Sequence, residues 1–477
     1  MTSKADENVG ISVKTFSVLF AVVVLAAFLL RFYQLDAKPM HHDEAVLQVY
    51  YIEPMLRGEG LRYLGLEYHG LMPHLLSYPF VRLLGLSLFS LRFSAALFGA
   101  LTVALLYFLK DYIGRIGVLF SGAFLAVSPT FVYYSRQYTT YPCYIFFLLL
   151  IVIVALKCLR EFKTYQVCLL FMLSAFLLDI NEAFLFFLLI AGAFAYINFL
   201  FDGRSLEFLK KLGWMKVALG LLVFAFVFVL IQTSFFMYWS NLAGLVSGDI
   251  AGKAISAGHS KPFSYFFTIL IPLEIGILWI SAVGFAFFKR DKFSLFLIFW
   301  SLSYLCIFSL ISYKTNWMLF VVIFPLVLHT GNTVDYLIQR CRSAAMTAAA
   351  LALLILTLAF SIQQNYLYVN DFERNKLGYV ETSIDVNRLV SDINGYSEGR
   401  AEPVLVTARG YWPLPVYLKG FSLSYMTDTQ KLNTSAYQGY DLYIVDKDQT
   451  PDDVQPFVVE EYELRQGYLI SVLYRKR

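Results

Sequence analysis

The sequence predicts a mainly α-helical membrane protein, a polytopic bundle of about eleven spans followed by a C-terminal α/β domain. Three observations support this fold class. Of the 477 residues, 58% are hydrophobic and only 15% are charged, whereas about a quarter of an average soluble domain is charged. Long apolar runs recur along most of the chain. From about residue 364 they stop, and short valine-rich stretches replace them.

Eleven runs approach the roughly 20 apolar residues that a spanning helix needs. They lie near residues 14–33, 91–109, 115–133, 140–156, 166–180, 182–201, 215–237, 264–288, 292–311, 316–334 and 344–362. The first run continues into "LRFYQLDAKP" without a small-residue cleavage site, so we expect a retained anchor. The apolar segment 71–89 contains two prolines and Arg82, so we expect an interfacial or re-entrant segment there.

Basic residues predict the orientation of the spans. With the N-terminus inside, the inner loops carry fourteen lysine and arginine residues and the short outer loops carry four. Because cytoplasmic loops are enriched in basic residues, this asymmetry favours an extracytoplasmic C-terminal segment. We therefore expect a membrane domain over 1–363, which includes a first outer loop at 34–90, and an extracytoplasmic α/β domain over 364–477.

The C-terminal segment has the pattern of a small α/β domain. The runs "EPVLVT" and "DLYIVD" are typical of buried strands, and "SIDVNRLVSDINGY" has helical spacing that ends near Gly395. The segment has no GxGxxG and no GxxxxGK[ST] motif, which argues against nucleotide binding. The net charge of +4 and the lack of a basic block argue against a nucleic-acid partner. The five cysteines form no CxxC pair and are expected to be apolar fillers.

The predicted orientation places the unusual polar motifs on one face. They are "HHDE" (41–44), "SRQY" (135–138), "DINE" (179–182) and "SYKTNW" (312–317). If the topology holds, all four lie in outer segments, and any chemistry is expected there. Candidate substrate-binding residues in or near these outer segments are His41, His42, His69, Tyr138, Asp179, Glu182, Tyr313 and Trp317.

The motif "HHDE" has two interpretations. It precedes "EAVLQVYYIE", whose spacing is typical of an amphipathic helix on a membrane surface. Asp43 and Glu44 in a first helical turn are stabilised by the helix dipole, and simple capping explains them. Alternatively, one carboxylate is an acid/base group, with His41 and His42 as candidate metal ligands. Because adjacent residues diverge on a helix, one carboxylate then faces the site and the other supports it.

The remaining motifs also allow structural explanations. Asp179 and Glu182 lie where two apolar runs meet, and ionisable residues at membrane depth are costly enough to indicate function. A hairpin turn wetted by lipid headgroups is the alternative. Arg136 and Lys314 lie at outer span ends, against the charge bias. Snorkelling explains either one singly, whereas two cations near acidic clusters fit a site for an anionic group such as phosphate. For Trp317 and its neighbour Tyr313, the commoner role is that of interfacial aromatics.

These motifs resemble a known group of enzymes. The retained first span, "HHDEA", "YHGLMPHLL" and "LRFSAALFGALTVALLYFL" resemble, in this order, the GT-C glycosyltransferases of the protein-mannosyltransferase and aminoarabinose-transferase type. More closely, "HHDEA", "YKTNW" and "YWPLPVYL" (411–418) resemble the prokaryotic flippase-activity-associated family of predicted membrane mannosyltransferases. The resemblance covers most of the chain, and "HHDEA" at this distance from the first span is its specific part.

The resemblance implies a transferase of the cell envelope. The expected donor is a sugar on a polyprenyl phosphate, and the sugar passes with inversion to an acceptor hydroxyl at the outer membrane face. Asp43 is the implied general base, and Glu44 is its neighbour in the acidic pair. The acceptor can be a glycan, a lipid or a protein, and the membrane lipid is a further partner.

The sequence departs from the family pattern at two positions. Asn181 stands where a lysine is expected, and Asn316 stands where a proline is expected. Without that lysine, Arg136 and Lys314 are the expected donor phosphate-binding residues. No cofactor is required with certainty, although a divalent metal could share the phosphate charge. The alternative function is a transporter or flippase for a lipid-linked sugar. It predicts polar residues through the depth of several spans, whereas here they gather at one face.

Overall fold

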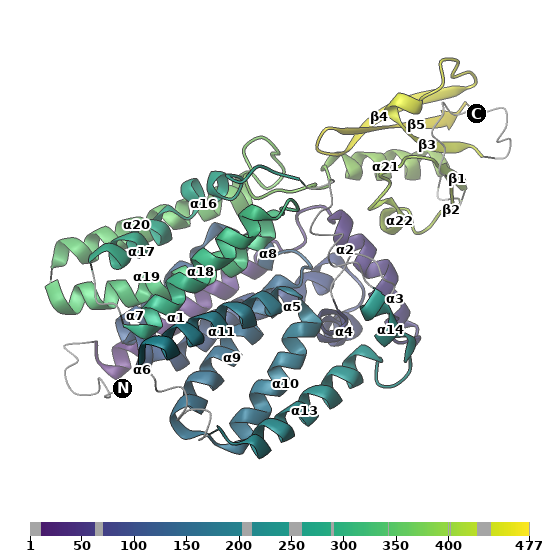
Figure 1. Cartoon of the computed structure of the whole chain (residues 1–477). Coiled ribbons are helices and arrows are strands. Elements are labelled where there is room, and N and C mark those ends of the chain that lie inside the picture. Colours follow the sequence, from purple (N-terminus) through teal and green to yellow (C-terminus); the bar gives the residue numbers. More distant parts are fainter. Residues whose placement is uncertain are drawn as a thin grey trace. The chain divides into compact units, whose positions relative to one another are not determined.

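The computed structural model describes residues 11–62, 70–202, 212–247, 260–287, 291–341, 343–398, 400, 402–426 and 440–476. The chain forms two compact units (Figure 1). The first comprises Met1–Leu35 and Met55–Leu367, and the second comprises Asp36–Pro54 and Tyr368–Arg477. This division differs from the predicted one, because residues 36–54 of the first outer loop group with the C-terminal segment.

The first unit is built from helices. Its main helices are α1 (Val13–Phe32), α4 (Met72–Leu84), α5 (Leu88–Leu105), α6 (Lys110–Ile113), α7 (Arg115–Val127), α8 (Pro129–Ser135), α9 (Tyr141–Glu161), α10 (Thr164–Ile180), α11 (Ala183–Asp202), α13 (Trp214–Gln232), α14 (Ser240–Ser247), α16 (Phe267–Leu273), α17 (Ile275–Phe287), α18 (Lys292–Leu310), α19 (Leu319–Cys341) and α20 (Ala344–Ile362). Helix α10 packs along α13, and α19 packs against α7, α17 and α18.

Each of the eleven predicted runs coincides with a helix or a bent pair of helices. Among the described residues, seven helices are long and apolar enough to cross a membrane, or nine if each of two bent pairs is one span. Helix α10 (Thr164–Ile180) and the part Ala183–Asn198 of α11 are also apolar and are not counted among these spans. The structure therefore has the helices of a multi-pass membrane protein, and the number of eleven spans stays a prediction. The segment expected to be interfacial forms α4, with Pro79 inside the helix.

One buried carboxylate joins the two bent pairs. Helices α7 and α8 meet at 58°, and α16 and α17 meet at 93°. Glu274 lies at the second bend. It accepts hydrogen bonds from the Ser128 hydroxyl at 2.7 Å and from the Thr130 N–H at 3.1 Å, both at the first bend. The first N–H groups of a helix have no intrahelical partner, and the Glu274 carboxylate supplies an acceptor for the N–H of Thr130. In the sequence Glu274 is a lone charge in an apolar run, and no local motif singles it out.

The second unit contains a five-stranded mixed sheet in the order β2-β1-β3-β5-β4 (Figure 1). Its elements are α2 (His42–Leu47), a π-helical turn (Gln48–Ile52), α3 (Glu53–Leu56, whose last residues belong to the first unit), α21 (Asp385–Ser397), β1 (Pro403–Val406), α22 (Leu414–Tyr417), β2 (Ser422–Tyr425), β3 (Leu442–Asp446), β4 (Phe457–Arg465) and β5 (Tyr468–Arg475). Strand β1 runs parallel to β2 and β3, and β5 runs antiparallel to β3 and β4.

Helix α21 covers one face of this sheet. Its apolar residues recur at helical spacing and pack on alternate residues of the strands. The buried cluster includes Val386, Leu389, Ile393, Val404 and Ile444. The intervening strand residues Leu405 and Tyr443 belong to a second buried cluster, because successive side chains of a strand point to opposite faces. The two predicted strands and the predicted helix are β1, β3 and α21.

Candidate functional site

The motif "HHDE" forms the start of helix α2. His41 is the N-cap residue, and its backbone N–H donates to Glu44 Oε2 at 2.8 Å. In return, its ring Nδ1 accepts a hydrogen bond from the Asp43 N–H at 3.1 Å. Such a reciprocal pair supplies partners for N–H groups that the helix itself leaves unpaired. Glu44 is buried in this role.

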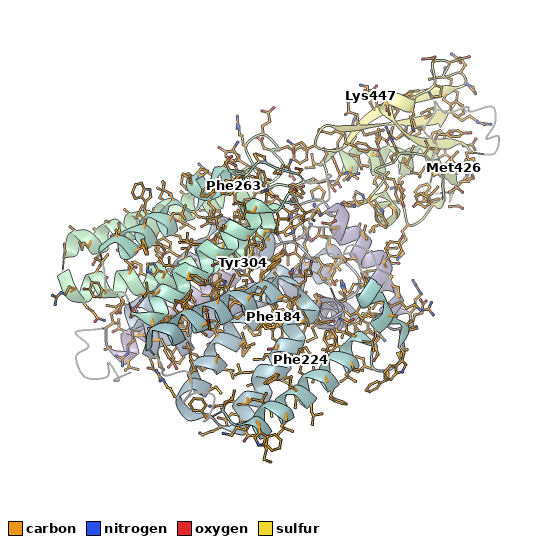
Figure 2. The ribbon with its side chains drawn as sticks, in the orientation of Figure 1. Phe184, Phe224, Phe263, Tyr304, Met426 and Lys447 are labelled. Atoms are coloured by element: carbon orange, nitrogen blue, oxygen red, sulfur yellow. The ribbon has the colours of Figure 1, made fainter. Side chains whose placement is uncertain are left out.

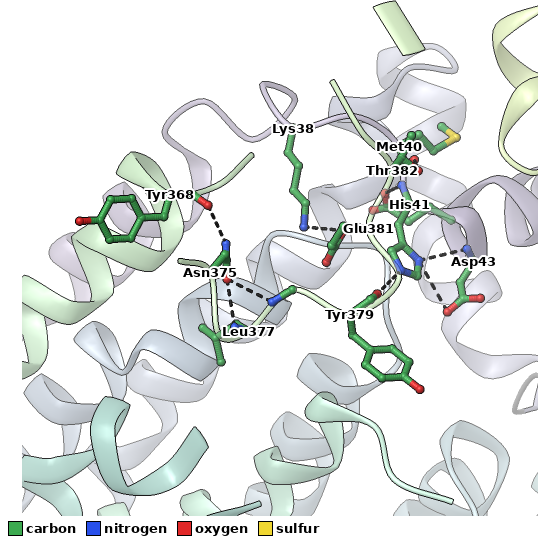
Figure 3. Close-up of polar contacts among 12 residues, drawn as sticks. Lys38, Met40, His41, Asp43, Tyr368, Asn375, Leu377, Tyr379, Glu381 and Thr382 are labelled. Carbon is green, nitrogen blue, oxygen red and sulfur yellow. Dashed lines mark hydrogen bonds and ion pairs between the residues drawn. The ribbon is translucent and has the colours of Figure 1, made fainter. Parts of the chain in front are cut away.

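Both ring nitrogens of His41 are occupied (Figure 3). Because Nδ1 accepts a hydrogen bond, the ring proton is on Nε2, which donates to the Tyr379 carbonyl at 3.0 Å. A neutral imidazole used in this way has no lone pair left for a metal. Within the described ranges, no group of three or more His, Cys, Asp or Glu side chains could hold a metal ion. We therefore assign His41 to positioning the first turn of α2.

The two adjacent carboxylates have different environments. The Asp43 side chain is 27% exposed, and its Oδ1 lies 3.2 Å from His42 Nδ1. Glu44 is buried and accepts from the N-cap backbone. The carboxylates diverge, as adjacent residues on a helix must. Asp43 is consequently the one of the two that can meet a substrate.

The segment that leads into α2 is bound to residues near the C-terminus in the same unit (Figure 3). Lys38 Nζ lies 2.7 Å from Glu381 Oε2, and Thr382 Oγ1 donates to the Met40 carbonyl at 2.7 Å. The Met40 N–H donates to the Tyr417 hydroxyl at 2.9 Å. These partners are more than 300 residues apart in the chain, up to 377 for Met40 and Tyr417. The contacts explain why residues 36–54 group with the C-terminal segment.

Arg465, at the end of β4, is a candidate that the sequence analysis missed. Its backbone forms an isolated antiparallel bridge with Thr382, which itself contacts Met40. Burial lowers the pKa of Arg465, while Tyr468, Asp43 and Asp446 raise this pKa through their charges. Arg465 is thus a cation within electrostatic reach of Asp43. Nothing in the local pattern around Arg465 signals this, because the pairing depends on the sheet.

In the first unit, Asp179 of "DINE" has the contacts of a helix cap. It is fully buried at the end of α10, and its carboxylate accepts from the Met72 N–H and from the side-chain amide of Gln232. Met72 begins α4, whose first N–H groups need partners. A Cβ atom at Gly70 would lie under 3.0 Å from Asp179, so glycine permits this close approach. Substrate binding by Asp179 stays a prediction.

The motifs "DINE" and "SYKTNW" come together at Tyr141, the first residue of α9. Glu182 and Tyr313 both lie within electrostatic reach of Tyr141, and Asn181 forms a side-chain hydrogen bond with it. The Asn181 amide also donates to Thr140 Oγ1 at 3.4 Å. Glu182 and Tyr313 are predicted site residues from separate motifs. Tyr141 was not predicted, because in the sequence it resembles an ordinary interfacial aromatic.

The two predicted phosphate-binding cations are bound to backbone carbonyls. Arg136 donates to four carbonyls at the end of α1, among them those of Tyr33 and Gln34, the latter at 2.9 Å. Lys314 Nζ donates to the Lys261 carbonyl at 3.0 Å and to the Ile311 carbonyl. Burial lowers the pKa of Lys314. These contacts account for both buried cations without a phosphate, whose binding stays a prediction.

The other predicted residues are placed as follows. Tyr138 is buried, and its hydroxyl lies 2.7 Å from Nδ1 of His74, a partner that the sequence analysis did not select. The Trp317 ring lies edge-on to the ring of Tyr134, with 6.2 Å between centroids. His69 lies outside the described residues.

Comparison of the sequence with known proteins finds nothing: no protein-family model matches, and no curated protein is significantly similar. The structure, in contrast, is similar to solved glycosyltransferases. ArnT from Cupriavidus metallidurans bound to undecaprenyl phosphate aligns with a TM-score of 0.67 and 13% identity, over 97% of this chain and 98% of that chain.

Two further structures are similar at lower scores. The archaeal oligosaccharyltransferase AglB from Archaeoglobus fulgidus, in complex with an inhibitory peptide and a dolichol-phosphate, has a TM-score of 0.59 and 12% identity, over 90% of this chain and 69% of that chain. The arabinofuranosyltransferase AftD from Mycobacteria has a TM-score of 0.53 and 12% identity, over 98% of this chain and 42% of that chain.

These similarities concern the fold. At identities of 12–13%, coverage of nearly the whole chain shows that the fold is like that of GT-C glycosyltransferases such as ArnT. The predicted fold class, a helical membrane bundle with a small C-terminal α/β domain, is therefore confirmed. Membership of the flippase-activity-associated mannosyltransferase family stays a prediction.

Proposed function

We propose that this protein is a membrane glycosyltransferase that moves a sugar from a polyprenyl-phosphate donor to an acceptor hydroxyl, with inversion at the anomeric carbon. The observation that carries the proposal is the first turn of α2. There Asp43 keeps a partly exposed carboxylate, while His41 and Glu44 hold the turn in place. The fold supports the donor class, because ArnT was solved with undecaprenyl phosphate and AglB with a dolichol-phosphate.

Asp43 acts as the general base in this proposal. Its carboxylate takes the proton of the acceptor hydroxyl as the acceptor oxygen attacks the anomeric carbon. The bond from that carbon to the phosphate oxygen breaks, and both of its electrons leave with the polyprenyl phosphate. A single displacement of this kind inverts the anomeric configuration. The donor already carries a good leaving group, so the protein must orient the acceptor and stabilise the phosphate charge.

The neighbours of Asp43 suit this role. Arg465, held against the sheet at the end of β4, lies within electrostatic reach of the carboxylate. His41 uses one ring nitrogen for the Asp43 N–H and the other for the Tyr379 carbonyl, which fixes the backbone that carries the base. A base is effective only when its geometry is held in this way.

The test is the pair of variants Asp43→Asn and Glu44→Gln. Asparagine keeps the shape of the side chain but accepts no proton, so transfer from a polyprenyl-phosphate sugar should fall by a factor on the order of 10²–10⁴. Glutamine at the Glu44 position still accepts from the His41 N–H, since capping boxes use either residue. Purified protein in lipid nanodiscs and mass spectrometry of the glycosylated product give the measurement.

The Glu44→Gln variant should keep most of the activity, and both variants should unfold at the same temperature as the wild type. Turnover near the wild-type rate in Asp43→Asn would remove the base assignment. A protein that moves the lipid-linked sugar across the membrane of a proteoliposome, with no glycosylated product from any acceptor, would instead be the transporter or flippase of the alternative prediction.

A further inference from the structure

Four aromatic side chains of the second unit form a continuous cluster, here called the aromatic platform. Tyr50 comes from the π-helical turn after α2, and its ring centroid lies 6.0 Å from that of Trp412. Tyr411 stacks on Trp412 at 5.7 Å and contacts Tyr425, at the end of β2, at 4.7 Å. The proposed transfer reaction uses none of these residues, although "YWPLPVYL" is a motif of the sequence analysis.

The aromatic platform is accessible and firmly held. Tyr50 is 41% exposed and Tyr425 is 44% exposed. Met426, labelled in Figure 2, follows Tyr425. The loop that carries Tyr411 is fixed at Gly410, whose N–H donates to the Tyr468 hydroxyl at 2.8 Å and whose carbonyl accepts from Arg465. A cluster of exposed aromatic rings on a fixed backbone is typical of a binding surface, because a bound ligand covers apolar area that is otherwise in contact with water.

Two links connect the aromatic platform to Asp43. Asp43 and Tyr50 lie on one continuous helical segment, about 10 Å apart along its axis at roughly 1.5 Å per residue. In addition, Arg465 donates to the carbonyl of Gly410, next to Tyr411, and lies within electrostatic reach of Asp43. A ligand that reaches Asp43 can therefore extend along this helical segment to the aromatic platform.

We propose that the aromatic platform binds a sugar ring of the acceptor, and that the acceptor is a glycan of at least two sugar units. This inference rests on the proposed function. A sugar ring has a face of C–H bonds that packs on an aromatic ring and an edge of hydroxyl groups. The three tyrosine hydroxyls and the indole N–H of Trp412 offer hydrogen bonds to that edge. If the reacting sugar lies at Asp43, the sugar ring at the platform belongs to a neighbouring sugar of the same glycan.

The chemistry of the platform favours a neutral glycan over a lipid headgroup. A lipid phosphate requires a cation. Lys419 is paired at 3.1 Å with Glu53, three residues after Tyr50, and Arg465 donates to the Gly410 carbonyl. Gln48 donates to the same Glu53 carboxylate at 3.0 Å. The four members of the platform carry a polar group on every ring, and these groups can hydrogen-bond to the hydroxyl edge of a sugar.

The experiment measures glycan binding without a donor. The full-length protein in nanodiscs is titrated calorimetrically with neutral oligosaccharides of mannose, glucose, galactose or N-acetylglucosamine, one to four units long. We expect at least one series in which the disaccharide binds more tightly than the monosaccharide. Tyr50→Ala and Tyr425→Ala should each weaken its binding roughly two- to tenfold. Tyr50→Phe and Tyr425→Phe keep the ring and lose one hydroxyl, so they should bind more tightly than the corresponding alanine variants.

The matched control is Leu469→Ala, a residue of β5 that is 38% exposed and lies outside the platform. Equal affinity in the wild type and both alanine variants overturns the inference, as does a failure of every oligosaccharide to bind. Quenching of Trp412 fluorescence by brominated lipid, measured against Trp412→Phe, would identify a membrane contact and also overturn it. Platform-dependent binding in a protein that transfers no sugar would refute the proposed function and leave the sugar site standing.

Discussion

At the residue scale, the two cations of the predicted outer segments are buried rather than snorkelling. Arg136 is 9% exposed and Lys314 is 2% exposed, whereas a snorkelling cation keeps its charged head in water. Arg136 directs its guanidinium to the carbonyls that end α1. Within the part of the chain that the structure describes, Lys314 donates to two carbonyls, whereas Arg136 donates to four. The two residues are therefore expected to respond differently to substitution.

For Lys314, we predict a role in donor binding. Lys314→Ala should weaken the binding of a non-transferable polyprenyl-phosphate sugar analogue by roughly 1.5–3 kcal/mol, the range for a hydrogen bond to a charged group. Lys314→Arg should be milder because it keeps the charge. The matched control is Lys216→Ala, since Lys216 Nζ also donates to a backbone carbonyl, that of Phe162, at 2.8 Å. Equal donor affinity in both alanine variants would restrict Lys314 to a structural role.

For Arg136, we predict that substitution lowers the thermal stability of the protein. Arg136→Lys should be damaging, because a single ammonium cannot reach the four carbonyls that the planar guanidinium serves. Thermal unfolding of the purified variant should show a lower Tm than Lys314→Arg. If instead the Tm is unchanged and only donor affinity is lost, Arg136 is a phosphate-binding residue, as the sequence analysis proposed.

At the element scale, small residues decide how the apolar helices pack. Hydrophobicity attracts helices into a membrane but does not pair them, so close pairs in membranes depend on small side chains. Helices α7 and α19 meet at such a place. A Cβ atom at Gly331 would lie under 3.0 Å from the Ser121 hydroxyl and from the Gly117 carbonyl. Gly192 of α11 is a glycine without such a neighbour, because a Cβ atom there meets nothing within 4 Å.

Gly331→Ala is therefore expected to destabilise the bundle by about 1–3 kcal/mol, the usual cost of overpacking. Gly192→Ala should leave stability unchanged or raise it slightly, since alanine is the better helix former. Thermal unfolding of both purified variants in detergent compares the two. A common Tm would show that α7 and α19 do not need the close approach at Gly331.

At the scale of the whole molecule, the "HHDE" segment and the C-terminal domain belong to one compact unit. The ion pair of Lys38 with Glu381 and the hydrogen bond of His41 with Tyr379 join them directly. Asp43 and the sheet are consequently on the same side of any membrane that the first unit spans. Which side this is follows from the charge bias of the loops, and it stays a prediction.

We predict that this side is extracytoplasmic. A cysteine at the exposed position Asp453 should react with a membrane-impermeant thiol reagent in intact cells. A cysteine at Lys163, an exposed residue between α9 and α10 on the predicted inner side, should react only after the cells are opened. The wild-type chain gives the background from its own cysteines. Protection at Asp453 together with labelling at Lys163 would reverse the orientation.

The sequence by itself determined the elements, because the signals that specify them are local. Apolar runs of sufficient length predict the helices of the bundle, and valine-rich runs predict β1 and β3. The divergence of Asp43 and Glu44 also follows from their adjacency on a helix. In contrast, the bends at Glu274 and Ser128 are not signalled by hydropathy alone.

Only the tertiary structure decided which polar groups meet. It placed Arg465 and Tyr379 beside the first turn of α2. It also committed Arg136 to the end of α1. These pairings join segments separated by about a hundred to several hundred residues. No local pattern encodes them, because a buried polar group takes whichever partner the packing of distant elements brings within hydrogen-bond distance.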